Sequence, residues 1–441
     1  MARALALLAA LVVALSAAAC GGDEGGSGDG SATIRFMVFG DPEELKAYRT
    51  LISAFGERQT DVRVQLVEAS DRDDLIARLS TSFAGGSPPD VFLINYRFYG
   101  QFASRGVLEP LEERVDESDE FEQADFYPQA LDAFRWEGKL TCLPQNISSL
   151  VVYYNRDVFR RYRVPEPRAA WTWNEFVGTA VQLTRDRGGR ILRGGDPEAG
   201  GIAPAVYGLG VEPTLIRIAP FVWSNGGRFV DNVRRPTRLT LDEPKALQAL
   251  GAFLELRSIY GVIPSDVEVE AEDDESRFAN GRLAMLLSSR RSTPTFRTIT
   301  AFDWDVAALP RFARPAGILH SDAYCMTTAS DDKDATWRFI EFANSPEGQR
   351  IVAETGRTVP SLKEVSSSDA FLDSAAKPRN SQVFLDGIAT IRHVPTVSTW
   401  PEIEDTAEGV LENGLYLGQP AEHVARELDR VTRPLFARAR R

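Results

Sequence analysis

Residues 33–94 read TIRFMVFGDPEELKAYRTLISAFGERQTDVRVQLVEASDRDDLIARLSTSFAGGSPPDVFLI. The pattern predicts strands over 33–39, 62–66 and 91–94, separated by helices over 42–55 and 71–83. Asp41 and Pro42 supply an N-cap and a first-turn proline, and we expect Gly56 to end the first helix. The last strand is apolar at every position, which indicates burial on both faces and a parallel sheet covered by helices on both sides. The sequence therefore predicts an α/β fold.

Ligands in open sheets of this kind bind beyond the carboxyl ends of the strands. Here those ends fall at residues 39–41, 70–71 and 95–97. Farther along, apolar periodicity predicts helices over 173–183, 245–260, 335–342 and 421–436 and a strand over 283–287. A stretch rich in Gly and Pro over 188–204 is expected to be a surface loop.

The N-terminus predicts export. Arg3 is followed by an apolar stretch over 4–19 and then by Cys20, a pattern typical of a signal peptide over 1–19. The segment resembles a bacterial lipoprotein signal, in which Cys20 becomes the acylated first residue at the outer face of the cell membrane. Ala17 departs from the Leu, Val or Ile usual at its position, so ordinary cleavage after residue 19 is the alternative. Residues 20–32 are polar and rich in Gly, which predicts a flexible linker.

Composition excludes several classes of partner and site. A net charge of -13 argues against a nucleic-acid surface or an anionic-membrane surface, so the acyl chains would be the only membrane attachment. Cys142 and Cys325 lack the clustered spacing of a metal site; we expect buried free thiols, with a disulfide as the alternative.

No catalytic motif is recognisable, so we expect no catalysis, no metal and no cofactor. An exported carbohydrate hydrolase remains the alternative from another class, because the carboxylates of glycosidases leave no local signature. Trp223 and Trp400 lie beside loop-like residues. There an exposed aromatic face would offer a platform for a sugar ring.

Seven short motifs occur in order along the chain: GSPPDVF at 86–92, GVLEPL at 106–111, LP at 143–144 leading into VVYYNRDVF at 151–159, TWNEF at 172–176, SNGG at 224–227, FANGRLAM at 278–285 and SPEGQ at 345–349. In this order they resemble the sugar-binding solute-binding proteins of ABC importers, the group that includes the maltodextrin receptor. The resemblance implies a two-lobed, periplasmic-binding-protein-like fold. Lobe 1 would comprise 33–143 and 323–375, and lobe 2 would comprise 144–322 and 376–441 with the C-terminal helices.

The same resemblance implies a monomer that closes on a small-molecule carbohydrate and delivers it to ABC permease subunits with a separate ATPase. A receptor that presents its ligand to a sensor is an alternative. The chain departs from the sugar-binding pattern at 288–291 and 320–324. Arg97, Arg291 and Arg357 could then add positive charge to the cleft, so a sugar acid or a phosphorylated polyol is a further alternative. Arg290 and Arg357 are interpreted instead as partners of acids such as Asp322. The expected ligand-binding residues are Asp41, Tyr96, Arg97, Asn146, Ser148, Trp223, Arg291, Asp322, Arg357 and Trp400.

Overall fold

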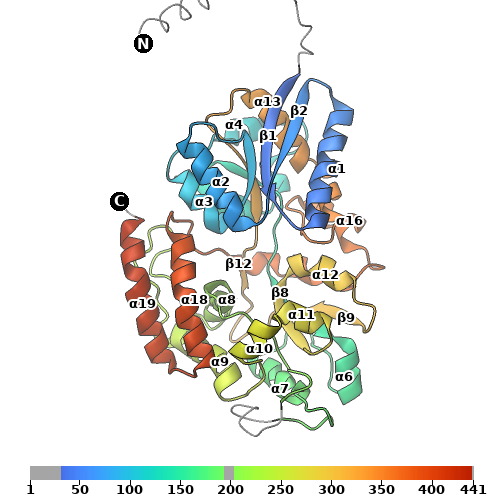
Figure 1. Cartoon of the computed structure of the whole chain (residues 1–441), viewed down its shortest axis with the longest axis vertical. Coiled ribbons are helices and arrows are strands. Elements are labelled where there is room, and N and C mark those ends of the chain that lie inside the picture. The colour runs from blue at the N-terminus through green and yellow to red at the C-terminus, as the bar shows by residue number, and fades with distance from the viewer. Residues whose placement is uncertain (1–30, 193–202, 440–441) are drawn as a thin grey trace, which may run out of the picture.

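The computed structural model describes residues 31–192 and 203–439, which form two lobes, one above the other in Figure 1. The upper lobe contains a five-stranded sheet with the order β2-β1-β3-β11-β6. β1 pairs in parallel with β2 and β3, as predicted, whereas β11 runs antiparallel to both β3 and β6. The strands are β1 Ala32–Phe39, β2 Val62–Ala69, β3 Val91–Asn95, β6 Cys142–Pro144 and β11 Asp322–Met326.

Helices cover both faces of this sheet (Figure 1). The first begins after its predicted cap, since Asp41 Oδ1 accepts a hydrogen bond from the Glu44 amide at 2.9 Å. The prediction that Gly56 ends it is wrong, because the helix continues to Arg58 and Gln59 then bonds both the amide and the carbonyl of Val62. The helices of this lobe are α1 Pro42–Arg58, α2 Arg72–Ala84, α3 Tyr96–Ala103, α4 Glu112–Asp116, α5 Pro128–Ala133, α13 Lys333–Asn344, α14 Pro346–Ala353 and α15 Lys363–Ser366.

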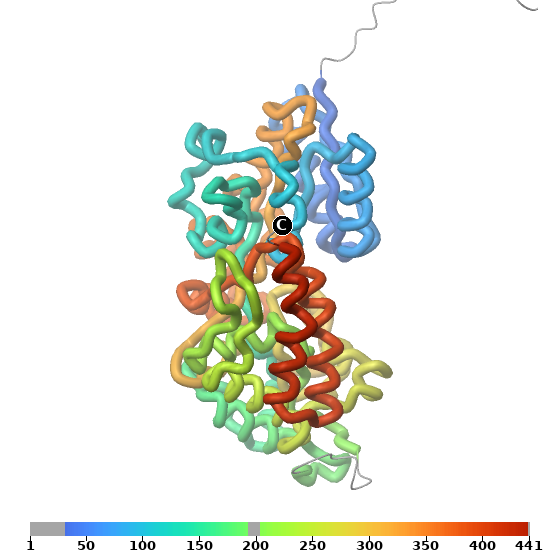
Figure 2. The backbone as a smooth tube through the Cα atoms, turned by 90° about the vertical axis from the view of Figure 1, so that its left-hand side faces the viewer, coloured from blue at the N-terminus to red at the C-terminus, as the bar shows by residue number. Residues whose placement is uncertain are grey.

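The lower lobe is built on an antiparallel sheet with the order β8-β7-β9, formed by β7 Leu150–Asn155, β8 Met285–Ser289 and β9 Trp304–Ala307. The helices α18 Trp400–Tyr416 and α19 Ala421–Arg438 lie side by side at one side of the lower lobe, on the left in Figure 1 and in front in Figure 2. Its other helices are α6 Arg156–Tyr162, α7 Trp173–Leu183, α8 Leu215–Ser224, α9 Pro244–Ser258, α10 Asp266–Ala271, α11 Asp274–Ala279, α12 Thr293–Arg297 and α17 Gln382–Asp386.

Shorter elements complete the chain: α16 Asp369–Leu372, β4 Arg135–Trp136, β5 Lys139–Leu140, β10 Gly317–Ile318 and β12 Ile391–Arg392. In the described residues, no helix has the length and apolar character needed to cross a bilayer. The predictions for residues 1–30, and most of the loop predicted over 188–204, lie outside the described residues.

Two crossing segments join the sheets of the two lobes at a waist, and the chain passes between the lobes once more between α15 and α17. The first connects β6 to β7, and the second leads from β10 back into β11. They are paired to each other, because the Ser148 amide donates to the His320 carbonyl at 2.8 Å and the His320 amide donates to the Ser148 carbonyl at 2.9 Å. The first also contacts the segment after α14, where the Ile147 amide donates to the Val359 carbonyl at 2.8 Å.

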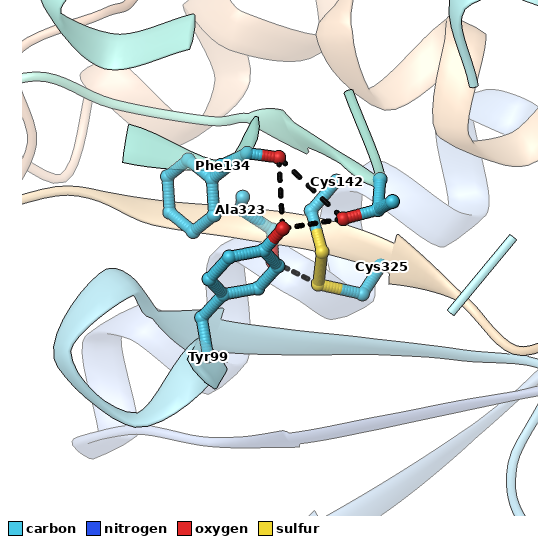
Figure 3. Close-up of a disulfide and its surroundings, with 6 residues drawn as sticks. Tyr99, Phe134, Cys142, Ala323 and Cys325 are labelled. Carbon is cyan, nitrogen blue, oxygen red and sulfur yellow. Dashed lines mark hydrogen bonds between the residues drawn. A yellow bond between two sulfur atoms is a disulfide. The ribbon is translucent and has the colours of Figure 1, made fainter. Parts of the chain in front are cut away.

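A disulfide joins Cys142 of β6 to Cys325 of β11, beside these crossings (Figure 3). The expectation of free thiols is therefore wrong. The two cysteines face each other in antiparallel register, with their Cα atoms 4.3 Å apart, a separation that sequence alone does not reveal. Next to the bond, the Tyr99 hydroxyl contacts the Phe134 carbonyl at 3.1 Å and the Thr141 hydroxyl at 2.6 Å.

Candidate ligand-binding site

Asp322 lies at the waist, where β11 begins, and its side chain bonds residues from two other segments. Its Oδ1 accepts a hydrogen bond from Asn95 Nδ2 at 3.1 Å, and its Oδ2 accepts one from Asn146 Nδ2 at 3.2 Å. The Asp322 amide donates to Asn146 Oδ1 at 3.2 Å. Asn95 ends β3 and Asn146 lies in the first crossing, so the structure brings two of the expected site residues, Asn146 and Asp322, into direct contact.

Arg357 pairs with two acids at the start of α1. Its Nη1 forms an ion pair with Asp41 Oδ2, and its Nε lies 2.8 Å from Glu44 Oε2. The interpretation that Arg357 pairs with acids is therefore confirmed, although the acids are not Asp322. Burial raises the pKa of Glu44 to about 7, against the opposing effect of the Arg357 charge. Glu44 is not among the residues that the sequence predicted for the site, although it shares Arg357 with Asp41.

Arg97 connects the upper lobe to α18. Its Nη1 lies 2.5 Å from Glu404 Oε2, and the two side chains are only 15% and 14% exposed. Glu404 Oε1 in turn accepts a hydrogen bond from the Trp400 indole at 2.8 Å. Beside Arg97, Tyr96 is fully buried, with its ring edge-on to that of His393. Arg97 and Trp400 are thus brought together through one carboxylate.

The expectation of exposed aromatic faces at Trp223 and Trp400 is wrong. Trp400 is the first residue of α18, is 0% exposed and packs against Phe436 of α19. Trp223 lies in α8, is 6% exposed and packs against Phe229. Their neighbours looked loop-like because both residues lie close to helix ends. The tertiary packing, which the local sequence does not encode, covers both rings.

Ser148 and Arg291 lie on different parts of the waist. Ser148 is buried in the first crossing, whereas Arg291 is half exposed just after β8 and pairs with Glu275 at 3.3 Å. The interpretation of Arg290 as the partner of an acid is wrong. This side chain is 1% exposed and bonds the Gly356 carbonyl at 2.7 Å and the Ser381 hydroxyl at 3.1 Å. Its Cζ lies 4.7 and 5.1 Å from the ring centres of Phe371 and Phe384.

Sequence reasoning missed two further groups at the waist, Arg217 and Arg72, and did not consider His320 as a site residue. Arg217 lies in α8 and is 3% exposed, and its Nη2 is 2.8 Å from Glu212 Oε2. Burial, and then the positive charges of Arg217, Arg97, Arg291 and Arg72, hold the pKa of His320 well below its usual value. A lone arginine in the apolar stretch LIRIAPFVWS is the one local signal that pointed to Arg217.

The waist therefore gathers guanidinium, carboxylate, amide and imidazole groups from both lobes and from the crossings. Such groups orient the hydroxyl or anionic groups of a small polar ligand by directional hydrogen bonds. Among residues 31–192 and 203–439, no group of three or more His, Cys, Asp or Glu side chains is arranged to hold a metal ion. The arrangement suits reversible binding of a polar molecule.

Comparison with known proteins agrees with this architecture. A family model described as bacterial extracellular solute-binding protein matches residues 50–379. A galactooligosaccharide-binding protein of Bacillus subtilis is 21% identical over 377 residues, which cover 82% of each chain. An ABC substrate-binding protein of Listeria monocytogenes in complex with cycloalternan has a TM-score of 0.80 at 24% identity, covering 92% of this chain and 99% of that one. UgpB of Mycobacterium tuberculosis in complex with glycerophosphocholine has a TM-score of 0.76 at 21% identity, covering 93% and 100%. The predicted two-lobed fold is confirmed.

Proposed function

Because the chain belongs to the bacterial extracellular solute-binding protein family, we propose that it is the substrate receptor of an ABC importer and captures a carbohydrate between its lobes. The observation that carries the proposal is the convergence of polar groups at the waist, where Arg97 of one lobe pairs with Glu404 of the other and Asp322 bonds Asn146 at the crossings. A ligand that contacts both lobes stabilises the closed form relative to open forms. Similarity to the galactooligosaccharide-binding and cycloalternan-bound proteins supports a carbohydrate as the ligand.

The lobes in this proposal comprise 33–143 with 323–375, and 144–322 with 376–441. The crossings between β6 and β7 and between β10 and β11 support the limits near 143 and 322. The closed receptor, acting as a monomer, would dock on permease subunits whose separate ATPase supplies the energy.

A thermal-shift screen tests this function. A carbohydrate that binds only the folded chain, at one hundred times its Kd, raises the free energy of unfolding by about 2.7 kcal/mol. Asp322→Ala should abolish the shift. Asp331→Ala, which removes an exposed acid from the loop before α13, should leave it unchanged. Release of product from glycosides by the purified chain would instead indicate the exported hydrolase, and stabilisation by none of the carbohydrates would contradict the receptor.

The tether is a separate proposal, in which an acyl group on Cys20 and the linker over 20–32 hold the receptor at the outer face of the cell membrane. A single acyl chain gives only marginal membrane binding, so stable anchoring requires more than one acyl group. Growth with a labelled fatty acid such as palmitate should label the wild-type chain and not the Cys20→Ser variant. A wild-type chain that is exported and cleaved without incorporating label would contradict the tether and leave the binding function intact.

A further inference from the structure

The start of α8 carries buried polar atoms that have no hydrogen-bond partner within residues 31–192 and 203–439. All ten residues of this helix are buried, and Arg217 is the one charged residue among them. Glu212 occupies Nη2 of Arg217, but Nε and Nη1 are buried and have no hydrogen-bond acceptor. A buried guanidinium with unused donors is costly unless an acceptor is supplied, which makes this side chain a candidate ligand-binding group.

Two further buried atoms without a hydrogen-bond partner in the described part of the chain lie in the segments around Arg217. Thr214 is the N-cap residue of α8, yet its hydroxyl is buried, makes no capping bond and has no other partner. In the second crossing, His320 Nε2 is also buried without a partner, while the backbone of this residue is fixed by Ser148. Amide groups at the start of a ten-residue helix favour negative charge, so Thr214 and Arg217, one turn apart, lie where an anion is stabilised.

The charges around this point favour an anion over a neutral group. Three arginines each have one acid partner within ion-pair distance: Arg217 has Glu212, Arg291 has Glu275 and Arg97 has Glu404. Arg72, at the start of α2, has no such partner among the described residues, and its Cζ lies 5.3 Å from the Phe98 ring centre. Burial, and then the positive charges of Arg291 and Arg97, lower the pKa of Arg217 against the opposing charge of Glu212. Burial, and then the charges of Arg97 and Arg291, lower the pKa of Arg72 against the opposing charge of Asp322. Like charges thus repel one another at the waist, and an anion bound there would relieve that repulsion.

We infer that the captured ligand carries an anionic group, a carboxylate or a phosphate ester, which binds at the start of α8 and accepts hydrogen bonds from Arg217 and Thr214. His320 Nε2 supplies a further contact. The inference rests on the proposed function and narrows the carbohydrate to an acidic sugar or a phosphorylated polyol. Guanidinium groups bind both oxyanions through paired hydrogen bonds, so the chemistry of the site is shared by the two sources.

Matched ligand pairs test the inference on the unmodified full chain by titration calorimetry. The carboxylate arm compares glucuronate with glucose and galacturonate with galactose. The phosphate arm compares glycerol 3-phosphate with glycerol and glucose 6-phosphate with glucose. In the arm that matches the natural ligand, the anionic member should bind about 10- to 100-fold tighter than its neutral partner, the effect of one or two charge-assisted hydrogen bonds. Its affinity should fall as salt is raised.

Variants locate the effect. Arg217→Gln should weaken the anionic member about 10- to 100-fold while the neutral partner changes less than threefold. Arg228→Gln removes an exposed arginine that pairs with Glu243 at 2.5 Å in the same lobe, and should change neither affinity. If Arg217→Gln does not fold, Thr214→Val removes one donor without altering charge and should weaken the anionic member about fivefold.

Three outcomes would overturn the inference. Neutral maltotriose or other neutral oligosaccharides binding tightly, while every anionic member binds no better than its partner, would contradict the anion and leave the proposed function intact. If the chain prefers the anionic ligands and both Arg217→Gln and Thr214→Val leave that preference unchanged, the anion does not bind at the start of α8. Binding of none of the probes would contradict the carbohydrate receptor and the inference together.

Discussion

Removal of the Cys142–Cys325 bond should destabilise the chain without preventing ligand binding. The bond joins residues 183 positions apart, and for a loop of that length the chain-entropy model gives a contribution of about 5 kcal/mol at 25 °C. Measured values are usually about 2–4 kcal/mol because the reduced unfolded chain retains structure. Both side chains are fully buried, so alanine substitution also removes some packing. We expect Cys142→Ala with Cys325→Ala to lower the free energy of unfolding by about 3–5 kcal/mol.

Urea denaturation measures this difference. In a Cys20→Ser background, dithiothreitol should lower the midpoint of the chain that retains both cysteines and leave that of the double alanine variant unchanged. Ligand affinity should be preserved, because backbone pairing of β6 with β11 remains. Two reactive thiols per denatured, unreduced chain, or a midpoint insensitive to dithiothreitol, would refute the reasoning.

Three further predictions concern the core, the waist and pH. Gly100→Ala places a Cβ against the Thr396 carbonyl and should cost about 1–3 kcal/mol in urea denaturation, whereas Gly178→Ala, whose Cβ meets nothing within 4 Å, should be neutral or stabilising. Arg290→Ala should cost about 3–5 kcal/mol because it removes buried hydrogen bonds, while the same change at half-exposed Arg291 should cost less than about 1 kcal/mol. The folded pKa of Glu44, about 7, lies above its unfolded value of 4.5, so its contribution to stability is complete below pH 4.5 and is lost as pH rises toward 7. The stability of the wild type relative to Glu44→Gln should therefore fall across that window, and a pH-independent difference would contradict the shift.

Elements with local signals were predictable from sequence. α7 begins and ends where the periodicity places it, because Thr172 and Glu175 form a capping box whose two members are three residues apart. The first three strands were also predictable from local signals. In each of them apolar and polar residues alternate, or every residue is apolar, over a few consecutive positions. The end of α1 was not predicted correctly, because it depends on hydrogen bonds between Gln59 and Val62, which lie beyond the helix. Likewise the disulfide depends on β11 pairing with β6, a relation between distant segments.

The site was predictable only in part. Asp322 and Asn146 were named from the positions of the crossings and lie in contact, but the partner of Arg97 is Glu404, 307 residues away, and no local pattern connects them. The burial of Trp400 depends on the later helix α19, which covers its face. Arg217 alone carried a local signal, because a charge inside a helix buried on all sides needs a partner or a function.

The second crossing links the rigid part of the waist to the proposed anion site. Asp322 lies three residues from Cys325 and Asn146 lies four from Cys142, so the pairing of β6 with β11, which the disulfide crosslinks, positions this acid and amide at the upper sheet. His320 is only two residues earlier, yet it feels the charge of Arg217 in α8 of the lower lobe. In the proposed closure, rotation of the lobes about the crossings would change the separation of Asp322 from Arg217. A ligand with hydroxyl groups at one end and an oxyanion at the other would donate to Asp322 and accept from Arg217, and its binding would thereby set the closed separation of the lobes.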